Sequence, residues 1–425
     1  MQKINTGTDA SRPTTGRQQA DMDAPRERRA HVSSGVYRRS RCEAGTWGKS
    51  SPCVLHCGMI DALRIAQVSP YGLDRYGGVR SHILGLGEAL QARGHVVTVI
   101  APGDDATLGT LQVLSCGRAR AVHFGGTHFD VAWASAMARR RIATERFDVM
   151  HLHAPWSPAL PLQLALDFRG ARVGTFHDVA GHATPAWARL LMPSASALIR
   201  TLFLHGTISV SPLVSAYLGA GTHELIPNGV ALPAAVDTAV PRAEPATLLY
   251  VGRLEPRKDV ETLLRAMSLL GAAAPPLWII GDGPSRTLLE AMQRDLALGT
   301  VTFFGAVSDA EKWRRLRLAT CLVAPSAAGE SFGIVLLEAM TMGTIPIAAD
   351  NPGYRHVLGD DGASLRFPPG DASALAARIR RIVHDPEWRA AMHRRMTSRW
   401  PAFAWTSIAE RVEATYRRAL LRARH

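Results

Sequence analysis

The sequence has little negative charge, few cysteines and no long apolar run, and each shortage excludes a class of protein. Of its 425 residues, 36 are acidic and 49 are Lys or Arg, so the formal net charge is +13. The five cysteines are scattered and form no disulfide framework, so we expect a reducing compartment. No apolar stretch reaches the roughly 18 residues of a membrane-spanning helix, so the chain is not expected to span a membrane.

The surplus of positive charge is spread through the chain in short blocks such as Arg139–Arg141 and Arg378–Arg381. A nucleic-acid surface usually gathers its basic residues in one strip with aromatic residues between them, and this sequence does not. We therefore expect no nucleic-acid partner. Phosphorylated substrates and an anionic membrane surface are the partners that such a charge attracts.

Residues 1–58 are rich in Arg, Ser, Gly and Thr and have no hydrophobic periodicity, which predicts a disordered N-terminal extension without a signal peptide. Met59 stands just before the first organised strand, so we hypothesise that translation of the native protein begins there. An intact mass that includes earlier residues would refute this. Cys53, His56 and Cys57 lie close together but lack a fourth ligand, so no metal site is predicted.

From residue 62 onwards, short apolar runs alternate with amphipathic helical patterns. This alternation is typical of α/β proteins with doubly wound parallel sheets, in which ligands lie at the carboxyl ends of the strands. It occurs twice, with a Pro- and Ala-rich stretch between the two series. The sequence predicts one domain at 59–226, a hinge at 227–246, a second domain at 247–385, and C-terminal helices at 386–425 that pack back on the first domain.

The segment Ala327–Gly343 runs from a small-residue turn into a helix and carries two carboxylates, Glu330 and Glu338. The N–H groups at a helix start have no internal partner, so Phe332 and Gly333 offer donors that suit a phosphate or a phosphorylated sugar. Glu338 lies in an apolar run and must be paired there or bound to sugar hydroxyls. The alternatives are a solvated turn residue for Glu330 and a salt-bridged core residue for Glu338.

Charged and titratable residues also follow two other strand-like runs. Arg253 and Lys258 flank the end of the run 248–251, which suits the clamping of a diphosphate. His177 directly follows the run 173–176, at the strand end where the catalytic groups of such sheets gather. Surface solvation of the two cations and a structural role for the histidine are the alternatives.

Two further segments each permit two interpretations. The pair Gly77-Gly78 lets the backbone approach a phosphate at a helix start, although such a pair is often only a turn. Residues 185–205 mix leucines and aromatic residues with Arg189 and Arg200. We expect a helix packed in its domain, and the alternative is an interfacial helix that lies on lipid.

The chain resembles the retaining glycosyltransferases of family 4 in four motifs that occur in the same order: Gly77-Gly78-Val79, Pro227-Asn228-Gly229-Val230, Gly252-Arg253 with Pro256-Arg257-Lys258, and Glu330 followed by Glu338 in ESFGIVLLEAM. The resemblance covers residues 62–420 and implies the GT-B architecture, in which two facing Rossmann-like domains hold the active site between them. Within the family, the chain is most similar to the bacterial phosphatidylinositol mannosyltransferases, through PYGLDRYGGVRSH, GTFHD, EPRK and GESFGIVLLEAM.

The resemblance assigns the 59–226 domain to the acceptor and the 247–385 domain to the nucleotide sugar. Among the residues of the second domain, Glu330 would hold hydroxyls of the donor sugar and Glu338 the nucleotide ribose. Arg253 and Lys258 would bind the diphosphate.

The remaining donor contacts implied by the resemblance involve both domains. The amides of Phe332 and Gly333 would meet the donor, and Gly77 and Gly78 would lie against its phosphates from the other domain. His177 would lie beside the transferred sugar and stabilise the transition state.

On the acceptor side, Tyr71, Asp74 and Arg80 fall where the lipid-using relatives contact the acceptor. The chain departs from the mannosyltransferases on this side. Ala154 stands where they usually carry a glutamate before proline, and Asp178 follows His177 where they tend to carry Thr or Ser.

The sequence thus predicts a cytoplasmic enzyme, peripheral at the inner face of the membrane, that transfers a hexose from a nucleoside-diphosphate sugar to a lipid or glycan acceptor with retention. Mannose from GDP-mannose is favoured through the resemblance. No metal or cofactor is expected, because Arg253 and Lys258 supply the positive charge. The alternatives are a sugar-nucleotide epimerase of the same fold and a non-catalytic membrane adaptor on a transferase scaffold.

Overall fold

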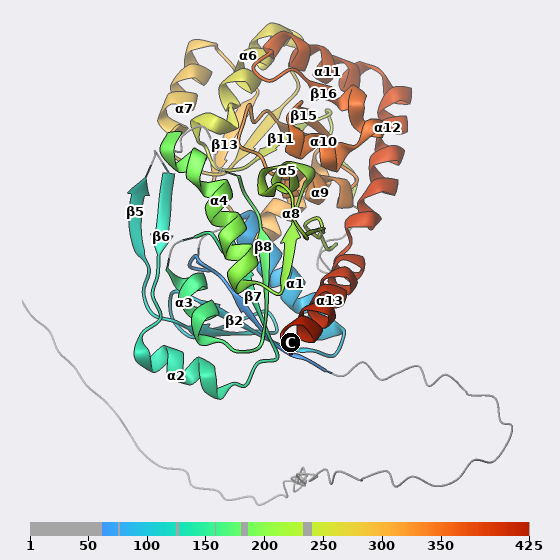
Figure 1. The fold of residues 1–425 in the computed structure, drawn as a ribbon. Coiled ribbons are helices and arrows are strands. Elements are labelled where there is room, and N and C mark those ends of the chain that lie inside the picture. Colours follow the sequence, from blue (N-terminus) through green and yellow to red (C-terminus); the bar gives the residue numbers. More distant parts are fainter. Residues whose placement is uncertain are drawn as a thin grey trace, which may run out of the picture. The chain divides into compact units, whose positions relative to one another are not determined.

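The computed structural model describes residues 62–74, 77–124, 127–157, 159–179, 186–232 and 240–424 (Figure 1). The predicted disordered extension at 1–58, the proposed start at Met59 and the cluster of Cys53, His56 and Cys57 lie outside these residues. Within them, no helix combines the length and the apolar character needed to cross a membrane.

The first half of the described chain forms an eight-stranded sheet with the order β10-β9-β8-β7-β1-β2-β4-β3. Neighbouring strands are parallel except β3 and β4. Strand order runs outward in both directions from β1, so the crevice for a ligand is expected at the carboxyl ends of β1 and β7. The strands are β1 (Arg64–Val68), β2 (Val96–Ala101), β3 (Ala106–Leu108), β4 (Leu111–Ser115), β7 (Val149–His153), β8 (Ala171–Phe176), β9 (Gly206–Ser209) and β10 (Glu224–Leu225).

Helices connect most of the parallel neighbours, whereas β2 and β4 are joined through β3. A separate antiparallel pair, β5 (Arg120–Phe124) and β6 (Thr127–Val131), lies between β4 and α2 in the sequence. The helices are α1 (Gly78–Ala92), α2 (Ala136–Thr144), α3 (Leu160–Asp167), α4 (Ala186–Phe203) and α5 (Pro212–Leu218).

The second half forms a six-stranded, all-parallel sheet with the order β13-β12-β11-β14-β15-β16. Every residue of β14 and β15 is buried, because helices cover both faces of such a sheet. The order reverses between β11 and β14, which makes their carboxyl ends the second expected ligand crevice. The strands are β11 (Leu248–Val251), β12 (Leu277–Ile280), β13 (Val301–Gly305), β14 (Cys321–Ala324), β15 (Ile345–Ala349) and β16 (Arg366–Phe367).

Side-chain caps begin several helices of this half. Asp259 accepts a hydrogen bond from the N–H of Thr262, and Ser308 accepts one from the N–H of Glu311, which satisfies donors that the helix leaves free. The helical elements are η1 (Pro256–Lys258), α6 (Val260–Leu270), η2 (Gly271–Ala273), α7 (Arg286–Asp295), α8 (Asp309–Leu318), α9 (Ile334–Thr341), α10 (Pro352–Leu358), η3 (Asp360–Leu365), α11 (Ala372–His384), α12 (Pro386–Arg399), η4 (Trp400–Phe403) and α13 (Trp405–Arg422).

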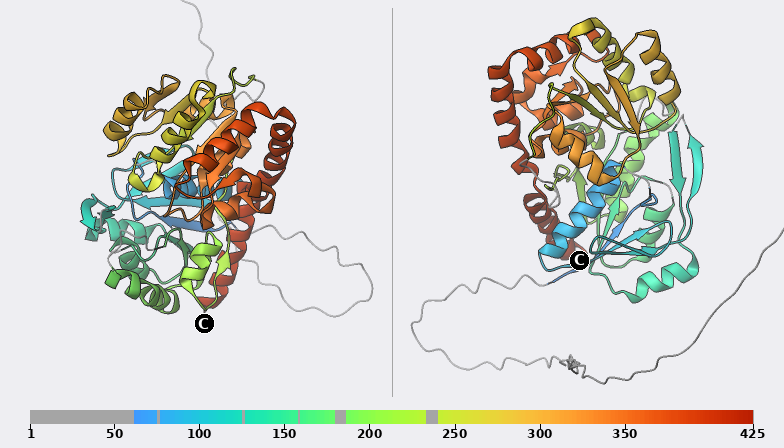
Figure 2. Two further views of the ribbon diagram at one scale, coloured as in Figure 1. Left: turned by 90° about the horizontal axis from the view of Figure 1, so that it is seen from above. Right: turned by 180° about the vertical axis from the view of Figure 1, so that it is seen from behind.

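The last two long helices belong to different cores. Met392 and Met396 of α12 are buried in the core of the second sheet. Ile408 and Tyr416 of α13 are buried in the core of the first sheet, and Figures 1 and 2 show α13 lying beside α1. The chain therefore returns to its first half only at its last helix. The domain boundaries set out above remain predictions.

Two crossing segments join the halves and pair with each other. The N–H of Val230 donates to the carbonyl of Phe403 at 2.8 Å, and the N–H of Trp405 donates to the carbonyl of Val230 at 3.2 Å. A side chain on Gly229 would collide with the Trp405 ring at 2.3 Å. The predicted hinge therefore begins with a glycine that makes room for the tryptophan of the other crossing segment.

Candidate active site

The loops after β11 and β14 bring opposite charges together. These strands are parallel neighbours, so the loops that follow them lie side by side. Lys258, the last residue of η1, contacts Glu330 Oε1, and Arg257 Nη1 lies 3.4 Å from the same oxygen. The Glu330 side chain is only 12% exposed. Two predicted residues, Lys258 and Glu330, are thus joined in one charge-assisted contact.

Arg253 and Glu255 extend this cluster toward solvent. Glu255 pairs with Arg253 and, at 2.9 Å, with Arg257 Nε. Partial burial alone would raise the pKa of Glu255, but the hydrogen bonds and charges of the two arginines lower it below its ordinary value. With Lys258, three cations face two carboxylates. Cations gathered in this way suit a diphosphate.

Asp178 of the first half faces this cluster. It follows the end of β8 by two residues. Ser331 Oγ donates a hydrogen bond to Asp178 Oδ1 at 3.5 Å. Asp178 is exposed to solvent on one side, but the protein around it excludes part of the water from its carboxylate. This desolvation raises the pKa of Asp178 above the ordinary value. Arg257 acts against this rise and Glu330 adds to it. Charges from both sheets therefore interact at one place.

The starts of α1 and α9 meet at the same junction. A side chain on Gly78, the first residue of α1, would come within 3.3 Å of Ile334 Cδ1, and Ile334 is the first residue of α9. Gly77 precedes α1 with an extended backbone and is exposed. Because the free N–H groups and dipoles of both helices favour negative charge, an anion is favoured between them.

The side chain of Phe332 anchors the loop before α9. It is buried, and its ring centroid lies 5.8 Å from that of His356 and 6.1 Å from that of Phe403. Gly333 has φ +100°, and a side chain there would collide with the Tyr354 ring at 2.5 Å. The predicted donor contact of Phe332 and Gly333 therefore falls to their backbone amides, since the phenyl ring packs into the core of the second sheet.

Glu338 lies 9% exposed on α9 and is paired. Its Oε1 accepts from Lys312 Nζ of α8 at 2.9 Å. Burial alone would lower the pKa of Lys312, but Glu338 raises it above its ordinary value. The sequence argument required a partner for Glu338, and Lys312 meets that requirement within the chain. The role of Glu338 toward a ribose remains a prediction.

His177 is buried at the end of a chain of hydrogen bonds from β1. Gln67 Oε1 lies 3.0 Å from His153 Nε2, and His153 Nδ1 lies 3.1 Å from His177 Nε2. If Gln67 Oε1 accepts a hydrogen bond from His153 Nε2, then His153 Nδ1 accepts a hydrogen bond from His177 Nε2. This network leaves His177 Nδ1 as an acceptor.

Four buried imidazoles gather around this network. Burial lowers the pKa of His82 to about 4 and that of His151 to about 3. Burial first, and then neighbouring imidazoles, lower the pKa values of His153 and His177 well below the ordinary range. All four are neutral near pH 7. Nitrogens of His82, His153 and His177 lie within 4.8 Å of one another, a spacing that a metal ion also permits.

The three residues predicted to contact the acceptor lie in or beside one loop after β1. Arg80 Nε donates to the carbonyl of Leu73 at 2.7 Å, which ties the start of α1 to this loop. The carbonyl of Tyr71 accepts from Ser69 Oγ at 2.7 Å, and Asp74 is exposed. The loop after β1 is therefore tied to the start of α1 through Arg80. The role of Tyr71, Asp74 and Arg80 toward an acceptor stays a prediction.

Sequence reasoning missed several members of the site. Arg257 stands in a motif that was noticed, and its place directly before Lys258 was the available signal. Lys312, Gln67 and His153 gave no signal, because each reaches the site from an element far away in the sequence. Asp178 was noticed only as a departure from the related enzymes.

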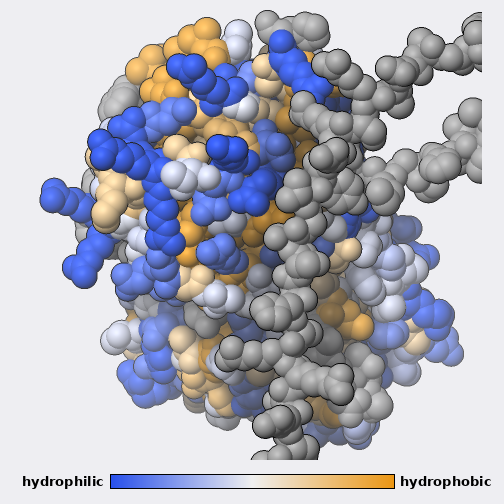
Figure 3. Space-filling model, turned by 90° about the horizontal axis from the view of Figure 1, so that it is seen from below, coloured by the Kyte–Doolittle hydropathy of each residue, from blue (hydrophilic) through white to orange (hydrophobic). Residues whose placement is uncertain are grey.

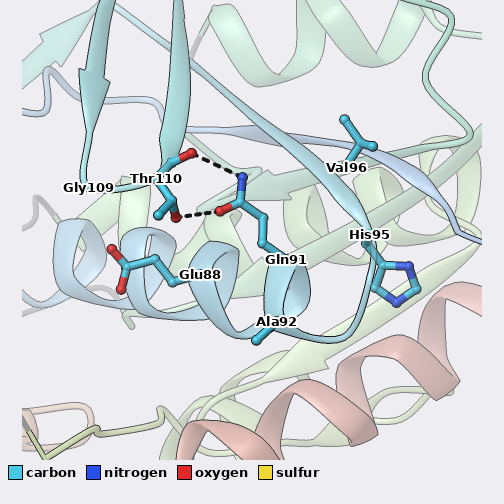
Figure 4. Close-up of a pocket in the computed structure, with 7 residues that line it drawn as sticks. All are labelled: Glu88, Gln91, Ala92, His95, Val96, Gly109 and Thr110. Carbon is cyan, nitrogen blue, oxygen red and sulfur yellow. Dashed lines mark hydrogen bonds between the residues drawn. The ribbon is translucent and has the colours of Figure 1, made fainter. Parts of the chain in front are cut away.

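A separate hollow lies at the far end of α1 and does not join this site. It has a volume of about 750 Å³ and is lined by Glu88, Gln91, Ala92, His95, Val96, Gly109 and Thr110 (Figure 4). The Gln91 side chain is closed on Thr110 by hydrogen bonds of 2.6 and 3.2 Å. The amide of Gln91 is thus satisfied by Thr110 within the hollow.

Family models match both halves of the chain. The model described as Glycosyltransferase Family 4 matches residues 76–232, and the model described as Glycosyl transferases group 1 matches residues 237–399. A phosphatidyl-myo-inositol mannosyltransferase of Mycolicibacterium smegmatis is 35% identical over 370 residues, which cover 83% of this chain and 93% of that one.

Solved structures match as well. The sucrose-phosphate synthase from Thermosynechococcus elongatus superposes with a TM-score of 0.67 and 25% identity, over 85% of this chain and 100% of that one. Anabaena Alr3699/HepE, solved with UDP and glucose, superposes with a TM-score of 0.66 and 17% identity over 83% of this chain and 99% of that one. These matches confirm the predicted α/β fold of the GT-B type.

Proposed function

The chain belongs to the family 4 glycosyltransferases, and we propose that it transfers a hexose from a nucleoside-diphosphate sugar to a lipid or glycan acceptor with retention of the anomeric configuration. The observation that carries the proposal is the contact of Lys258 and Arg257 with Glu330, opposite Asp178 of the other sheet. It brings a cationic cluster and a fixed carboxylate to the carboxyl ends of strands, where ligands of such sheets bind.

In this proposal the diphosphate of the donor lies on Arg253 and Lys258, with the start of α1 at Gly77 and Gly78 opposite. Arg253 is 59% exposed, so its guanidinium has room to turn from Glu255 to a phosphate. Positive charge at this place stabilises the diphosphate as it leaves, which is the main chemical task of the protein. No metal or cofactor is required in this account.

The transferred sugar lies between Glu330 and His177. The carboxylate of Glu330 is oriented by its two cations and accepts hydrogen bonds from hydroxyls of the sugar. The neutral ring of His177, oriented by His153, offers an acceptor at Nδ1 and carries no charge that would oppose an oxocarbenium-like transition state. The proposal contains no protein nucleophile, and the rate derives from positioning and electrostatics.

The nucleotide ribose lies on Glu338, whose Oε1 is paired with Lys312 Nζ at 2.9 Å. Mannose from GDP-mannose is the favoured donor sugar, because a relative with 35% identity is a phosphatidyl-myo-inositol mannosyltransferase. Tyr71, Asp74 and Arg80 are the proposed acceptor contacts. We place the enzyme in the cytoplasm, peripheral at the inner face of the membrane, where a lipid acceptor is present.

The test is a donor panel with an acceptor membrane. The purified chain is incubated with GDP-mannose, UDP-glucose or ADP-glucose, with and without vesicles that contain phosphatidylinositol, and released nucleoside diphosphate is measured. We expect acceptor-dependent release of GDP and an α-linked product by NMR. A β-linked product would contradict retention, and release of UDP or ADP alone would contradict the GDP-mannose assignment.

A further inference from the structure

Helix α4 (Ala186–Phe203) exposes leucines where a helix of a globular domain normally exposes charge. The side chains of Leu190, Leu191, Leu198 and Leu202 are 57–77% exposed. At 100° per residue, these four positions fall within an arc of about 120° on one side of the helix. Scattered apolar residues are common on protein surfaces, as Figure 3 shows on another face, but a stripe along one helix marks a binding surface.

The opposite side of α4 is the side that packs on the protein. Ser196 is buried, and Met192, Ile199 and Phe203 are partly buried. The helix contacts α5, and Figure 1 shows it at the outside of the first half. The leucine stripe is therefore not the face that holds α4 in its domain. The expectation of a helix packed in its domain therefore describes this side of α4 alone.

A cationic hollow adjoins the stripe at the end of α4. Arg200, His205 and Arg422 line this hollow of about 360 Å³, together with Thr201 of α4. Arg200 Nη2 donates to the carbonyl of Leu218 at 2.8 Å, and Arg422 Nη1 donates to that of His205 at 3.1 Å. Because a backbone carbonyl has no net charge, these hydrogen bonds do not neutralise either guanidinium group. An apolar stripe next to unneutralised cations complements an anionic lipid surface.

We propose that α4 docks this protein on an anionic lipid bilayer, with Leu190, Leu191, Leu198 and Leu202 in the acyl boundary and Arg422 at the headgroups. This inference rests on the proposed lipid acceptor. Helix α4 belongs to the same half of the chain as Tyr71, Asp74 and Arg80, the proposed acceptor contacts.

The experiment measures binding of the full chain to vesicles of phosphatidylglycerol and phosphatidylcholine by co-sedimentation. We expect the triple variant Leu190→Ser, Leu198→Ser, Leu202→Ser to partition at least about tenfold less well, because three apolar side chains leave the bilayer. The matched control is Leu269→Ser with Leu288→Ser, whose leucines are 58% and 57% exposed in the second half. This control should bind like the unmodified chain.

The charged part has its own variant. Arg422→Gln should weaken binding to phosphatidylglycerol vesicles about threefold to tenfold and should reduce its salt dependence. Binding to pure phosphatidylcholine that equals binding to the anionic vesicles would overturn the assignment of an anionic surface.

Three results would overturn the docking face itself. The first is that the triple variant binds vesicles as well as the unmodified chain does. The second is that the unmodified chain binds no vesicles. The third is that the unmodified chain forms a dimer in sedimentation velocity, the triple variant does not, and neither protein binds vesicles. The replaced leucines are exposed, so the thermal midpoint should be unchanged. If it falls, the single variant Leu198→Asp repeats the measurement.

Sugar transfer distinguishes this inference from the proposed function. GDP release from GDP-mannose with a short-chain, monomeric phosphatidylinositol needs no membrane, so the triple variant should retain it. A chain that transfers the sugar but binds no vesicle would refute docking alone. A chain that binds vesicles through the leucines but releases no nucleoside diphosphate from any donor would refute the proposed function alone.

Discussion

At the scale of single residues, Glu330 depends on the cations around it. Lys258 and Arg257 contact the same oxygen, Oε1, so the carboxylate is held in one orientation in a position that is 12% exposed. A group held in this way loses little entropy when a sugar hydroxyl binds to it. The same arrangement would be costly without a ligand-binding role, because it gathers three cations within one loop.

We predict that Glu330→Gln lowers sugar transfer by about 10- to 150-fold. The substitution removes a charge-assisted hydrogen bond to the reacting sugar, which is worth roughly 1.5–3 kcal/mol. The measurement is kcat/KM for nucleoside-diphosphate release with acceptor. Glu261→Gln on α6, at a 43% exposed side chain, is the matched control. Activity of Glu330→Gln within a factor of about two of the unmodified enzyme would refute the role.

We predict that Lys312→Met lowers the free energy of unfolding by about 1–3 kcal/mol. It leaves the carboxylate of Glu338 buried without its cation. Urea unfolding at pH 7 measures the change. The double variant Lys312→Met, Glu338→Gln should recover most of the loss, because it removes the unpaired charge. A single variant as stable as the unmodified chain would show that the pair contributes nothing to stability.

The sequence predicts residues of this site where they follow strands. Glu330 and Lys258 were both expected at strand ends, and they meet because β14 and β11 are neighbours in the sheet. Lys312 was not predicted, since it lies on the surface of a charged helix and only the fold turns it toward α9. Gln67 and His153 were not predicted as site residues, because their contact depends on the pairing of β1 with β7.

At the scale of elements, β7 and β8 carry polar side chains into the interior. His151 Nδ1 lies 2.7 Å from the Tyr416 hydroxyl of α13, and its Nε2 lies 2.7 Å from Thr175 Oγ1. The apolar periodicity predicted both strands but gave no reason for α13 to cover them. The hydrogen bond from Tyr416 shows why the last helix belongs to the first core.

These buried histidines predict a pH dependence of stability. Their pKa values in the folded chain lie at about 4 for His82, at about 3 for His151, and well below the ordinary range for His153 and His177. The unfolded chain binds protons to these rings below about pH 6.5, whereas the folded chain does not. Stability is therefore full above pH 6.5 and falls as the pH is lowered toward 4.

The expected slope is up to about 1.4 kcal/mol per pH unit for each histidine. Urea unfolding between pH 7 and pH 5 measures it in a window above that of Glu413, whose pKa is lowered to about 2 against the effect of burial by hydrogen bonds from Arg417 and Arg93. His82→Gln should reduce the slope. A free energy of unfolding that is the same at pH 7 and pH 5 would refute the account.

At the scale of the whole described chain, two sheets present the carboxyl ends of their strands to one junction. Gly78 and Ile334 bring two helix starts into contact there, and Asp178 interacts with the charges of the other half. The crossing segments at Val230 and Phe403 are hydrogen-bonded to each other. Motion of the halves about these segments is the proposed means by which the site closes on its donor and excludes water.

The central claim is that a nucleoside diphosphate lies on Arg253 and Lys258, and a thermal-shift panel tests it most directly. We predict that GDP raises the thermal midpoint of the unmodified chain more than UDP or ADP. Lys258→Ala should abolish most of the GDP effect and leave the smaller effect of guanosine unchanged, because only the diphosphate contacts this cation. Equal loss for GDP and guanosine, or no shift with any nucleoside diphosphate, would contradict the claim.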